Sequence, residues 1–212
     1  MDFQLTADQQ DLQARARELA RGSLEARAAE TDRSEQYPWD NVEDLKNGGF
    51  MGMTIPKAYG GQGRTFFDAT LVIEQMAQVC GVTGRIVVES NMGAISTVMK
   101  YGTEDQKRMA AEFVLNGDKP AICITEPEAG SAATEMTTRA DKRGDKYIIN
   151  GKSIGLQALA HPVYTSFLPA FLMSKAKNWV LAAFCASGTK HRGLALAIAN
   201  PQWACAVYRK LR

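Results

Sequence analysis

The spacing of apolar residues changes near Asp118, and this change restricts the chain to a helical half followed by a β half. Before Asp118, apolar side chains recur every three or four residues, as in amphipathic helices. After it, short apolar runs are separated by turn-forming residues, which is typical of strands. We therefore expect an α+β chain with an all-α domain over residues 1–117 and the first strands of a β domain over residues 118–152.

Start and stop signals divide the first half into separate helices. Thr6 is a predicted N-cap, and Pro38 stands at a predicted helix start. We expect helices over residues 9–29, 39–46, 66–79, 85–99 and 104–115. Between them we expect an extended segment over residues 50–56, a glycine-rich loop over 56–63 and an interruption over 80–84. In the β half, strands are expected over residues 120–124, 137–140 and 147–150, with a hairpin turn over 142–145.

The last 60 residues differ in composition from the rest of the chain. All 23 Asp and Glu residues lie at or before Asp145, whereas residues 153–212 contain seven Lys or Arg, both His and no acid. These positive charges are sparse and lie among Ala, Leu, Phe and Trp, unlike a basic arm that binds nucleic acid. The composition therefore changes near Lys152, from a segment with acidic residues to one without. No nucleic-acid partner is expected.

Targeting signals and metal motifs are not evident in the sequence. The chain starts without a basic and apolar leader, and no apolar run is long and clean enough to cross a bilayer. The four cysteines are far apart and form no C-x-x-C pair, which argues against a zinc site or a disulfide framework. We expect a cytoplasmic protein with buried free thiols, no metal and no membrane partner.

The stretch from Cys123 to Ser131 reads Cys-Ile-Thr-Glu-Pro-Glu-Ala-Gly-Ser, in which an apolar run gives way to a loop of small residues. Thr125 and Ser131 carry hydroxyls beside backbone donors, and Gly130 lacks a Cβ. Such a loop can press its backbone against a ligand that is rich in hydrogen-bond acceptors. The residues alone are equally compatible with a plain strand–loop junction.

This stretch resembles the flavin-contacting signature of the acyl-CoA dehydrogenases, and the likeness runs from Phe3 through Lys152. The resemblance implies FAD as cofactor and an acyl-CoA thioester as substrate. It places Ile124 and Thr125 at the flavin ring, and Gly130 and Ser131 near the flavin pyrophosphate and the acyl-CoA. It also implies a structural role for the glutamate at the position of Glu126, which we expect to hold the loop.

Members of this family continue from the helical domain through a β-barrel domain into a C-terminal helical bundle. That bundle supplies the usual catalytic glutamate and most of the contacts of a homotetramer. Nothing in this chain matches it. The resemblance therefore implies a truncated flavoprotein in which no catalytic residue is identified, and a tetramer is expected for the full-length family but not for this chain.

A narrower resemblance is to the 3-sulfinopropionyl-CoA desulfinases, a branch that keeps the fold and FAD but releases sulfite from an acyl-CoA. It is carried by residues 35–41, 84–86, 90–91, 117–123 and 135–142. The branch's substrate-anchoring arginine falls on Arg85. A buried arginine at this point of an apolar helix would need an anion, and a sulfinate suits its planar fork. The alternative is a solvated arginine paired with Glu89 one turn on.

The tail after Lys152 lacks the Trp-Ile-Thr segment that lines the flavin in the family. If one adenine is restored to a codon assignment for residues 152–158, the frame reads Lys-Lys-His-Trp-Ile-Thr-Gly. The same shift over residues 202–211 permits Met-Gly-Val-Arg-Gly-Ile-Pro-Glu-Thr, which is also similar to the family. We therefore expect residues 153–212 to be a translated frameshift. The alternative is a divergent tail with its own helices, for example over residues 167–186.

Three functions remain open from the sequence. The chain can derive from a desulfinase. It can derive from an ordinary short-chain acyl-CoA dehydrogenase, which oxidises an acyl-CoA with FAD. It can also be a catalytically dead remnant of the fold. Purified enzymes of this family are yellow. A colourless protein that does not bind CoA would therefore favour the remnant.

Overall fold

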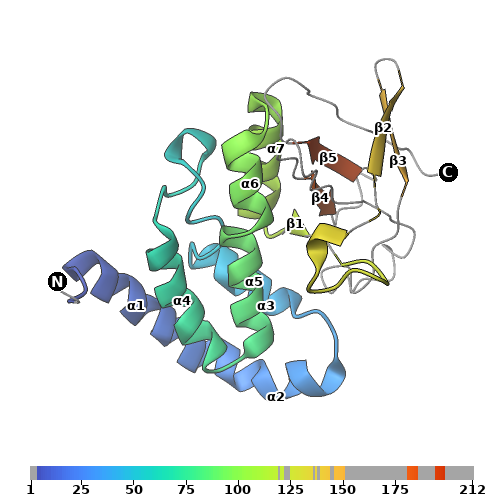
Figure 1. Cartoon of the computed structure of the whole chain (residues 1–212). Helices are drawn as coiled ribbons and strands as arrows, with labels where there is room; N and C mark the ends of the chain where they lie inside the picture. The colour runs from blue at the N-terminus through green and yellow to red at the C-terminus, as the bar shows by residue number, and fades with distance from the viewer. Residues whose placement is uncertain are drawn as a thin grey trace.

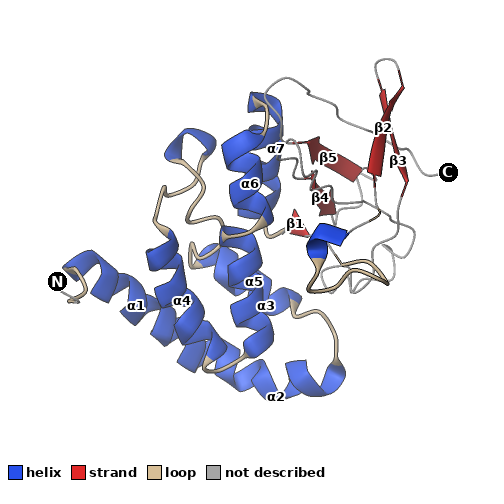
Figure 2. Cartoon of the chain, viewed as in Figure 1, coloured by secondary structure: helices blue, strands red, loops and turns tan. Residues whose placement is uncertain are grey.

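The computed structural model describes the helical half almost completely and parts of the rest. The described residues are 4–118, 120–121, 125–135, 137, 139–143, 146–150, 181–185 and 194–198. Figures 1 and 2 show the helices gathered on one side of the molecule and the strands on the other. The predicted helical half is confirmed, and the described strands all follow it in the chain.

A long helical stretch opens the fold. Helix α1 (Ala7–Leu19) continues through a π-helical turn (Ala20–Leu24) into α2 (Glu25–Ser34). As predicted, Thr6 is the N-cap, and its hydroxyl accepts a hydrogen bond from the backbone of Gln9. The buried residues of this stretch follow a step of four: Leu12, Ala16, Ala20 and Leu24.

The remaining helices form two packed groups. Helices α3 (Trp39–Asn47), α4 (Phe66–Ala77) and α5 (Gly81–Asn91) pack with α1 around one core that includes Val42, Leu45, Val72 and Met76. Helices α6 (Ala94–Tyr101) and α7 (Glu104–Leu115) enclose a second core with Ile55, Ile95 and Val114. Apolar side chains at helical spacing therefore do form the interior.

Besides shifts of a few residues at helix ends, three predicted segments differ in kind. Residues 50–56 form turns instead of an extended segment, because Gly52 adopts a left-handed φ of 65° and its carbonyl accepts a bond from Ile55 N–H. Helix α5 already begins at Gly81, so residues 81–84 do not interrupt it. The expected helix over 85–99 is instead broken at Met92 and Gly93, where Gly93 has a φ of 63°.

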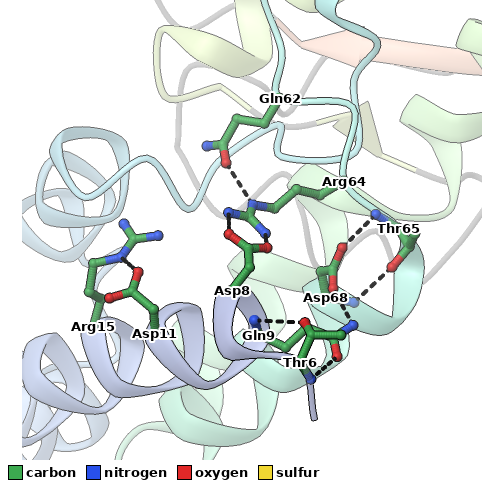
Figure 3. Close-up of polar contacts among 9 residues, drawn as sticks. All are labelled: Thr6, Asp8, Gln9, Asp11, Arg15, Gln62, Arg64, Thr65 and Asp68. Carbon is green, nitrogen blue, oxygen red and sulfur yellow. Dashed lines mark hydrogen bonds and ion pairs between the residues drawn. The ribbon is translucent and has the colours of Figure 1, made fainter.

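The N-termini of α1 and α4 are joined by a polar cluster (Figure 3). Gln9 closes the capping box of α1, Asp68 closes that of α4, and Gln9 Nε2 donates to Asp68 Oδ1 at 3.0 Å. Arg64 adds a two-pronged ion pair with Asp8, at 2.7 and 3.2 Å. The two helix starts therefore share their caps.

The described strands form one sheet of three strands and one hairpin. Strand β1 (Pro120–Ala121) pairs antiparallel with β4 (Leu181–Cys185), which pairs antiparallel with β5 (Leu194–Ile198). Strands β2 (Arg139–Arg143) and β3 (Lys146–Asn150) form the hairpin, in register from Arg139 opposite Asn150 to Arg143 opposite Lys146. The described parts of these strands do not close into a barrel.

The strand predictions are confirmed in position and corrected in extent. The first strand is described only as Pro120–Ala121, and the rest of the expected 120–124 run lies outside the described residues. The second starts at Arg139, not at residue 137, and extends through Arg143, so the predicted turn at 142–143 is strand. The alternative helix over 167–186 is wrong at residues 181–185, which are strand β4; its other residues are not described.

Candidate functional site

The loop that follows β1 contains a tight turn from Glu126 to Ala129. The two residues exchange backbone hydrogen bonds, with N···O distances of 3.0 and 3.2 Å. Both are buried, whereas Pro127 and Glu128 at the tip are exposed. The turn is therefore anchored at its base and open at its tip.

A buried carboxylate holds this loop together. Glu126 is 6% exposed, and its Oε2 accepts hydrogen bonds from both the backbone N–H and the hydroxyl of Thr137, each at 2.8 Å. These bonds join segments eleven residues apart in the sequence. Glu126 is thus engaged in structure, which confirms the loop-holding role expected for it.

The predicted flavin residues fall on this loop, as far as the structure describes them. Thr125 is half-buried at its start, and Gly130 and Ser131 are exposed after the turn. A Cβ at Gly130 would meet no atom within 4 Å, so packing against the described chain does not require glycine here. Ile124 lies outside the described residues. The open space at Gly130 and the exposed Ser131 hydroxyl leave room for a ligand to approach the backbone.

Arg85 lies away from this loop in the sequence, on the first half of α5. Its side chain is 61% exposed, and its Nε donates to Glu89 Oε1 at 2.8 Å. Arg85 is therefore not buried, and the expectation that its burial requires an anion is wrong. The alternative pairing with Glu89 is present, and a role for Arg85 in binding rests on the nitrogen atoms that this pairing leaves open.

Glu89 is the enclosed member of the pair, with a side chain only 13% exposed. Burial, assisted by the negative charges of Glu89 and Asp118, raises the pKa of Tyr37 well above its ordinary value. Tyr37 also meets Trp39 edge to face, with ring centroids 4.7 Å apart. Glu89, which pairs with Arg85, therefore acts electrostatically on a neutral phenol, and that phenol contacts the exposed indole of Trp39.

A buried polar network supports the start of α5, and the sequence prediction missed it. Asn41 is fully buried; its Nδ2 donates to Thr83 Oγ1 and its Oδ1 accepts from Arg27 Nε, both at 2.8 Å. Arg27 also pairs with Asp44, which accepts a further bond from Ser23 at 2.6 Å. Although burial opposes ionisation of Asp44, the bonds from Ser23 and Arg27 lower its pKa. The sequence does carry one sign of this network: Asn41 is a polar residue next to Val42, which lies on the apolar face of the helix.

A second missed residue is Asn91, at the end of α5. Its Nδ2 donates to the carbonyls of Phe50 and Val87, at 2.8 and 3.0 Å, and Thr54 donates back to it from its backbone and hydroxyl. The buried side chain thus ties the turns after α3 to the helix that carries Arg85.

The described part of the chain presents no cluster of three or more His, Cys, Asp or Glu residues that could hold a metal. It also has no helix long and apolar enough to cross a membrane. Cys80 is a buried free thiol.

The pattern of the acyl-CoA dehydrogenase N-terminal domain matches residues 6–118, more than half of the chain. The chain belongs to the acyl-CoA dehydrogenase family. Its fold supports this placement: a structure of glutaryl-coenzyme A dehydrogenase superposes with a TM-score of 0.67 at 28% identity, over 71% of this chain and 39% of that one. Butyryl-CoA dehydrogenase of Megasphaera elsdenii, at 22% identity, shares the fold with a TM-score of 0.72 over 94% and 57%.

Among characterised members of the acyl-CoA dehydrogenase family, the chain is 61% identical to the 3-sulfinopropanoyl-CoA desulfinase of Variovorax paradoxus over 150 residues, which are 71% of this chain and 38% of that protein. It is 36% identical to a short-chain acyl-CoA dehydrogenase of Clostridium acetobutylicum over 155 residues, 73% and 41% of the two chains. The chain therefore spans about two fifths of the length of the relatives it matches, and desulfinases are nearer to it than dehydrogenases.

Proposed function

We propose that residues 1–152 are the first part of an FAD-dependent enzyme that releases sulfite from 3-sulfinopropanoyl-CoA, the compound also called 3-sulfinopropionyl-CoA. The observation that carries this proposal is the difference between 61% identity to a desulfinase and 36% identity to a short-chain dehydrogenase over similar lengths. Three other desulfinases are 57–61% identical to the chain over 149–150 residues, which supports the same branch.

The reaction needs no external oxidant or reductant. The carbon–sulfur bond breaks, the carbon that carried sulfur gains a proton, and the sulfur takes an oxygen atom from water, which gives propanoyl-CoA and sulfite. A desulfinase therefore works without an electron acceptor, whereas a dehydrogenase needs one. This difference separates the two candidate activities experimentally.

The chain's own residues fit a role in holding cofactor and substrate. Thr125 supplies a half-buried hydroxyl, and the exposed backbone around Gly130 and Ser131 has room for the phosphate-rich part of FAD. FAD, when bound, supplies the electron-accepting ring that the family's chemistry depends on. Glu126 acts on this site only through the loop it holds. Arg85 would orient the sulfinate through its terminal guanidinium nitrogens.

For residues 153–212 we propose that the sequence is an out-of-frame translation of the family's middle domain. The similarity to the desulfinases spans 150 residues, which agrees with a boundary near Lys152. The antiparallel pairing of β1 with β4 uses backbone hydrogen bonds, which do not require a family sequence. Sequencing the locus tests this: an intact reading frame with no shortened adenine run contradicts it.

The activity is tested on the product of the gene with its frame restored. We expect sulfite release from 3-sulfinopropanoyl-CoA in the absence of any electron acceptor. Reduction of an acceptor dye with a simple acyl-CoA, without sulfite release from the sulfinate substrate, would replace the proposal by ordinary dehydrogenation. A product inert in both assays would point to the dead remnant.

A further inference from the structure

We infer that Glu89 is a positioning residue: it fixes the guanidinium of Arg85 so that an acidic acyl-CoA can reach only the edge formed by the two terminal nitrogens. This inference rests on the proposed function of Arg85 as the anchor of the acyl group. It assigns to Glu89 the direction from which the substrate's anionic end approaches.

The shape of the arginine fork limits how an anion can bind it. A guanidinium offers an anion two edges with paired donors, one made by Nε and a terminal nitrogen and the other by both terminal nitrogens. Glu89 Oε1 accepts from Nε at 2.8 Å and so occupies the first edge. Within the described residues, Glu89 is the one ion-pair partner of Arg85. The second edge therefore stays open for a planar anion such as a sulfinate.

Burial decides which partner positions the other. The Glu89 side chain is 13% exposed and the Arg85 side chain 61% exposed. The enclosed carboxylate has few positions available, whereas a free arginine on a helix surface samples many rotamers. The Glu89 side chain also lies near Tyr37. The negative charge of Glu89, added to burial, helps to raise the pKa of Tyr37. The carboxylate is thus the fixed point, and the guanidinium is ordered by it before a ligand arrives.

Another pair in this chain shows how an ordinary surface ion pair differs. Arg21 and Glu25 have the same order and spacing on the helix, but their side chains are 55% and 51% exposed. Arg21 contacts Glu25 through the terminal nitrogen Nη1 at 3.2 Å, which uses part of the edge that Arg85 keeps open. Helical spacing alone therefore does not produce the arrangement at Arg85, and Glu25 serves as a matched control.

Two opposite electrostatic effects act on the ligand, and their balance is measurable. The negative charge of Glu89 repels an incoming anion, which weakens binding. Ordering of the fork strengthens it, because hydrogen bonds to charged groups contribute only when donors and acceptors are aligned. Our inference is that ordering exceeds repulsion. Glu89→Gln removes the charge and with it the repulsion, and it leaves only a neutral amide oxygen, a weaker acceptor for Arg85 Nε, so the fork is ordered less well.

The test measures binding to the 212-residue chain by NMR titration, which follows dissociation constants into the millimolar range. The ligands are 3-sulfinopropanoyl-CoA and propanoyl-CoA, which lacks the sulfinate; the variants are Glu89→Gln, Arg85→Lys and Glu25→Gln. The ratio of the two dissociation constants reports recognition of the sulfinate alone, which a merely structural role would not move. The Nε–H signal of Arg85, assigned by its loss in Arg85→Lys, reports the ordering of the fork.

We expect the wild type and Glu25→Gln to prefer the sulfinate ligand equally, and Arg85→Lys to lose the preference. Glu89→Gln is expected to lose about 10-fold of the preference while it binds propanoyl-CoA unchanged, since one aligned charge-assisted bond is worth roughly a factor of ten or more. Its Arg85 Nε–H should exchange faster with water.

The failures of the two proposals are distinguishable. If the preference is lost in Arg85→Lys but kept or increased in Glu89→Gln, the role of Glu89 is wrong and the anchor remains. If the wild type and Arg85→Lys bind the two thioesters with the same ratio, or the chain binds neither, the anchor itself is overturned together with the inference that rests on it.

Discussion

At the scale of single residues, Glu126 and Arg85 show that the burial of a charged side chain is not visible in the local sequence. Glu126 has the right chemistry for catalysis, but it is buried and accepts two bonds from Thr137. Arg85 was expected to be enclosed by an apolar helix, but it lies on the open side of α5. For both residues, burial decides the role, and burial depends on partners distant in sequence.

The hold of Glu126 on its loop predicts a stability effect. Glu126→Ala should lower the free energy of unfolding by about 1–3 kcal/mol, because the charge-assisted bonds to Thr137 are lost. Amide exchange at Thr137 should accelerate with it. Urea unfolding and hydrogen exchange measure both effects. Glu128→Ala, at the exposed tip of the same turn, is the control and should change neither; equal effects of the two substitutions would contradict a specific role for Glu126.

The fork of Arg85 predicts a selective loss of activity in the frame-restored enzyme. Arg85→Lys keeps the charge but cannot present two parallel donors, so the sulfinate is held with looser orientation. We expect sulfite release per bound FAD to fall about 10²-fold. FAD content should stay at the wild-type level, since the loop at residues 125–131 is untouched. Equal sulfite release by both proteins would make Arg85 a plain surface arginine.

At the scale of elements, the sequence predicts helices well where their ends carry local signals. Thr6, Thr65 and Thr103 each begin a helix with a complete capping box, and α7 has the predicted bounds. Prediction failed at α5 because two glycines were interpreted as an interruption. Gly84 instead lies where α5 approaches α4: a Cβ there would meet Ala77 Cβ at 2.7 Å. Contacts between helices are not visible in a local pattern.

This close approach predicts different effects of one substitution at two positions of α5. Gly84→Ala should cost about 1–3 kcal/mol of stability, because the added methyl forces α4 and α5 apart. Gly81→Ala, where a Cβ meets no atom within 4 Å, should stabilise the protein by about 0.4–1 kcal/mol through a smaller loss of chain entropy. Urea denaturation of the two variants measures the contrast, and a similar cost at both sites would refute it.

The shared caps of α1 and α4 predict a pH dependence. Burial of Asp68 opposes its ionisation, but hydrogen bonds from the Thr65 N–H and Gln9 Nε2, together with the nearby Thr65 side chain, lower its pKa overall from 3.8. A lowered pKa stabilises the fold above the carboxyl's ordinary pKa, and this stabilisation is lost as pH falls through the folded value. Asp68→Asn should therefore be less stable than wild type at pH 6.

Urea unfolding from pH 6 down to about pH 2.5 measures this difference, which should shrink as the wild-type carboxyl takes up its proton. Asp105→Asn, in the first turn of α7, provides the same chemical change at a helix start whose cap is closed by Gln106. A stability difference for Asp68→Asn that is constant over the whole range would show that the ionised carboxylate is not what joins the two caps.

At the scale of the whole molecule, the proposed site would take only some of its residues from this chain. The described chain offers Thr125, Gly130 and Ser131 on one loop and Arg85 on α5. A contiguous motif and a narrow resemblance predict these positions, and their role in binding stays a prediction. Asn41 and Asn91, which support α5, were not predicted, since a single asparagine has no local signature of its partners.

The divided site predicts different cofactor occupancy in two gene products. The frame-restored protein should be yellow and carry FAD, whereas the 212-residue chain should bind FAD weakly or not at all. The reason is enclosure: a flavin held by one loop stays largely solvated. The visible absorbance of flavin per protein, after gel filtration, measures the difference. Stoichiometric FAD in the 212-residue chain would contradict the proposed origin of residues 153–212.

The π-helical turn between α1 and α2 has a consequence for how this helix can change length during evolution. A π turn closes over one residue more than an α turn. In an uninterrupted α-helix, four residues rotate through about 400°, so a stripe repeated every four residues, as from Leu12 to Leu24, would drift by about 40° at each step. Each residue in a π turn rotates the chain by less than about 100°, so the π turn reduces this drift. Gly22 within this turn departs from helical geometry, with φ −89° and ψ −109°, so the chain is already kinked here. Residues 20–24 are thus a place where a homologue can gain or lose a single residue between the two helices.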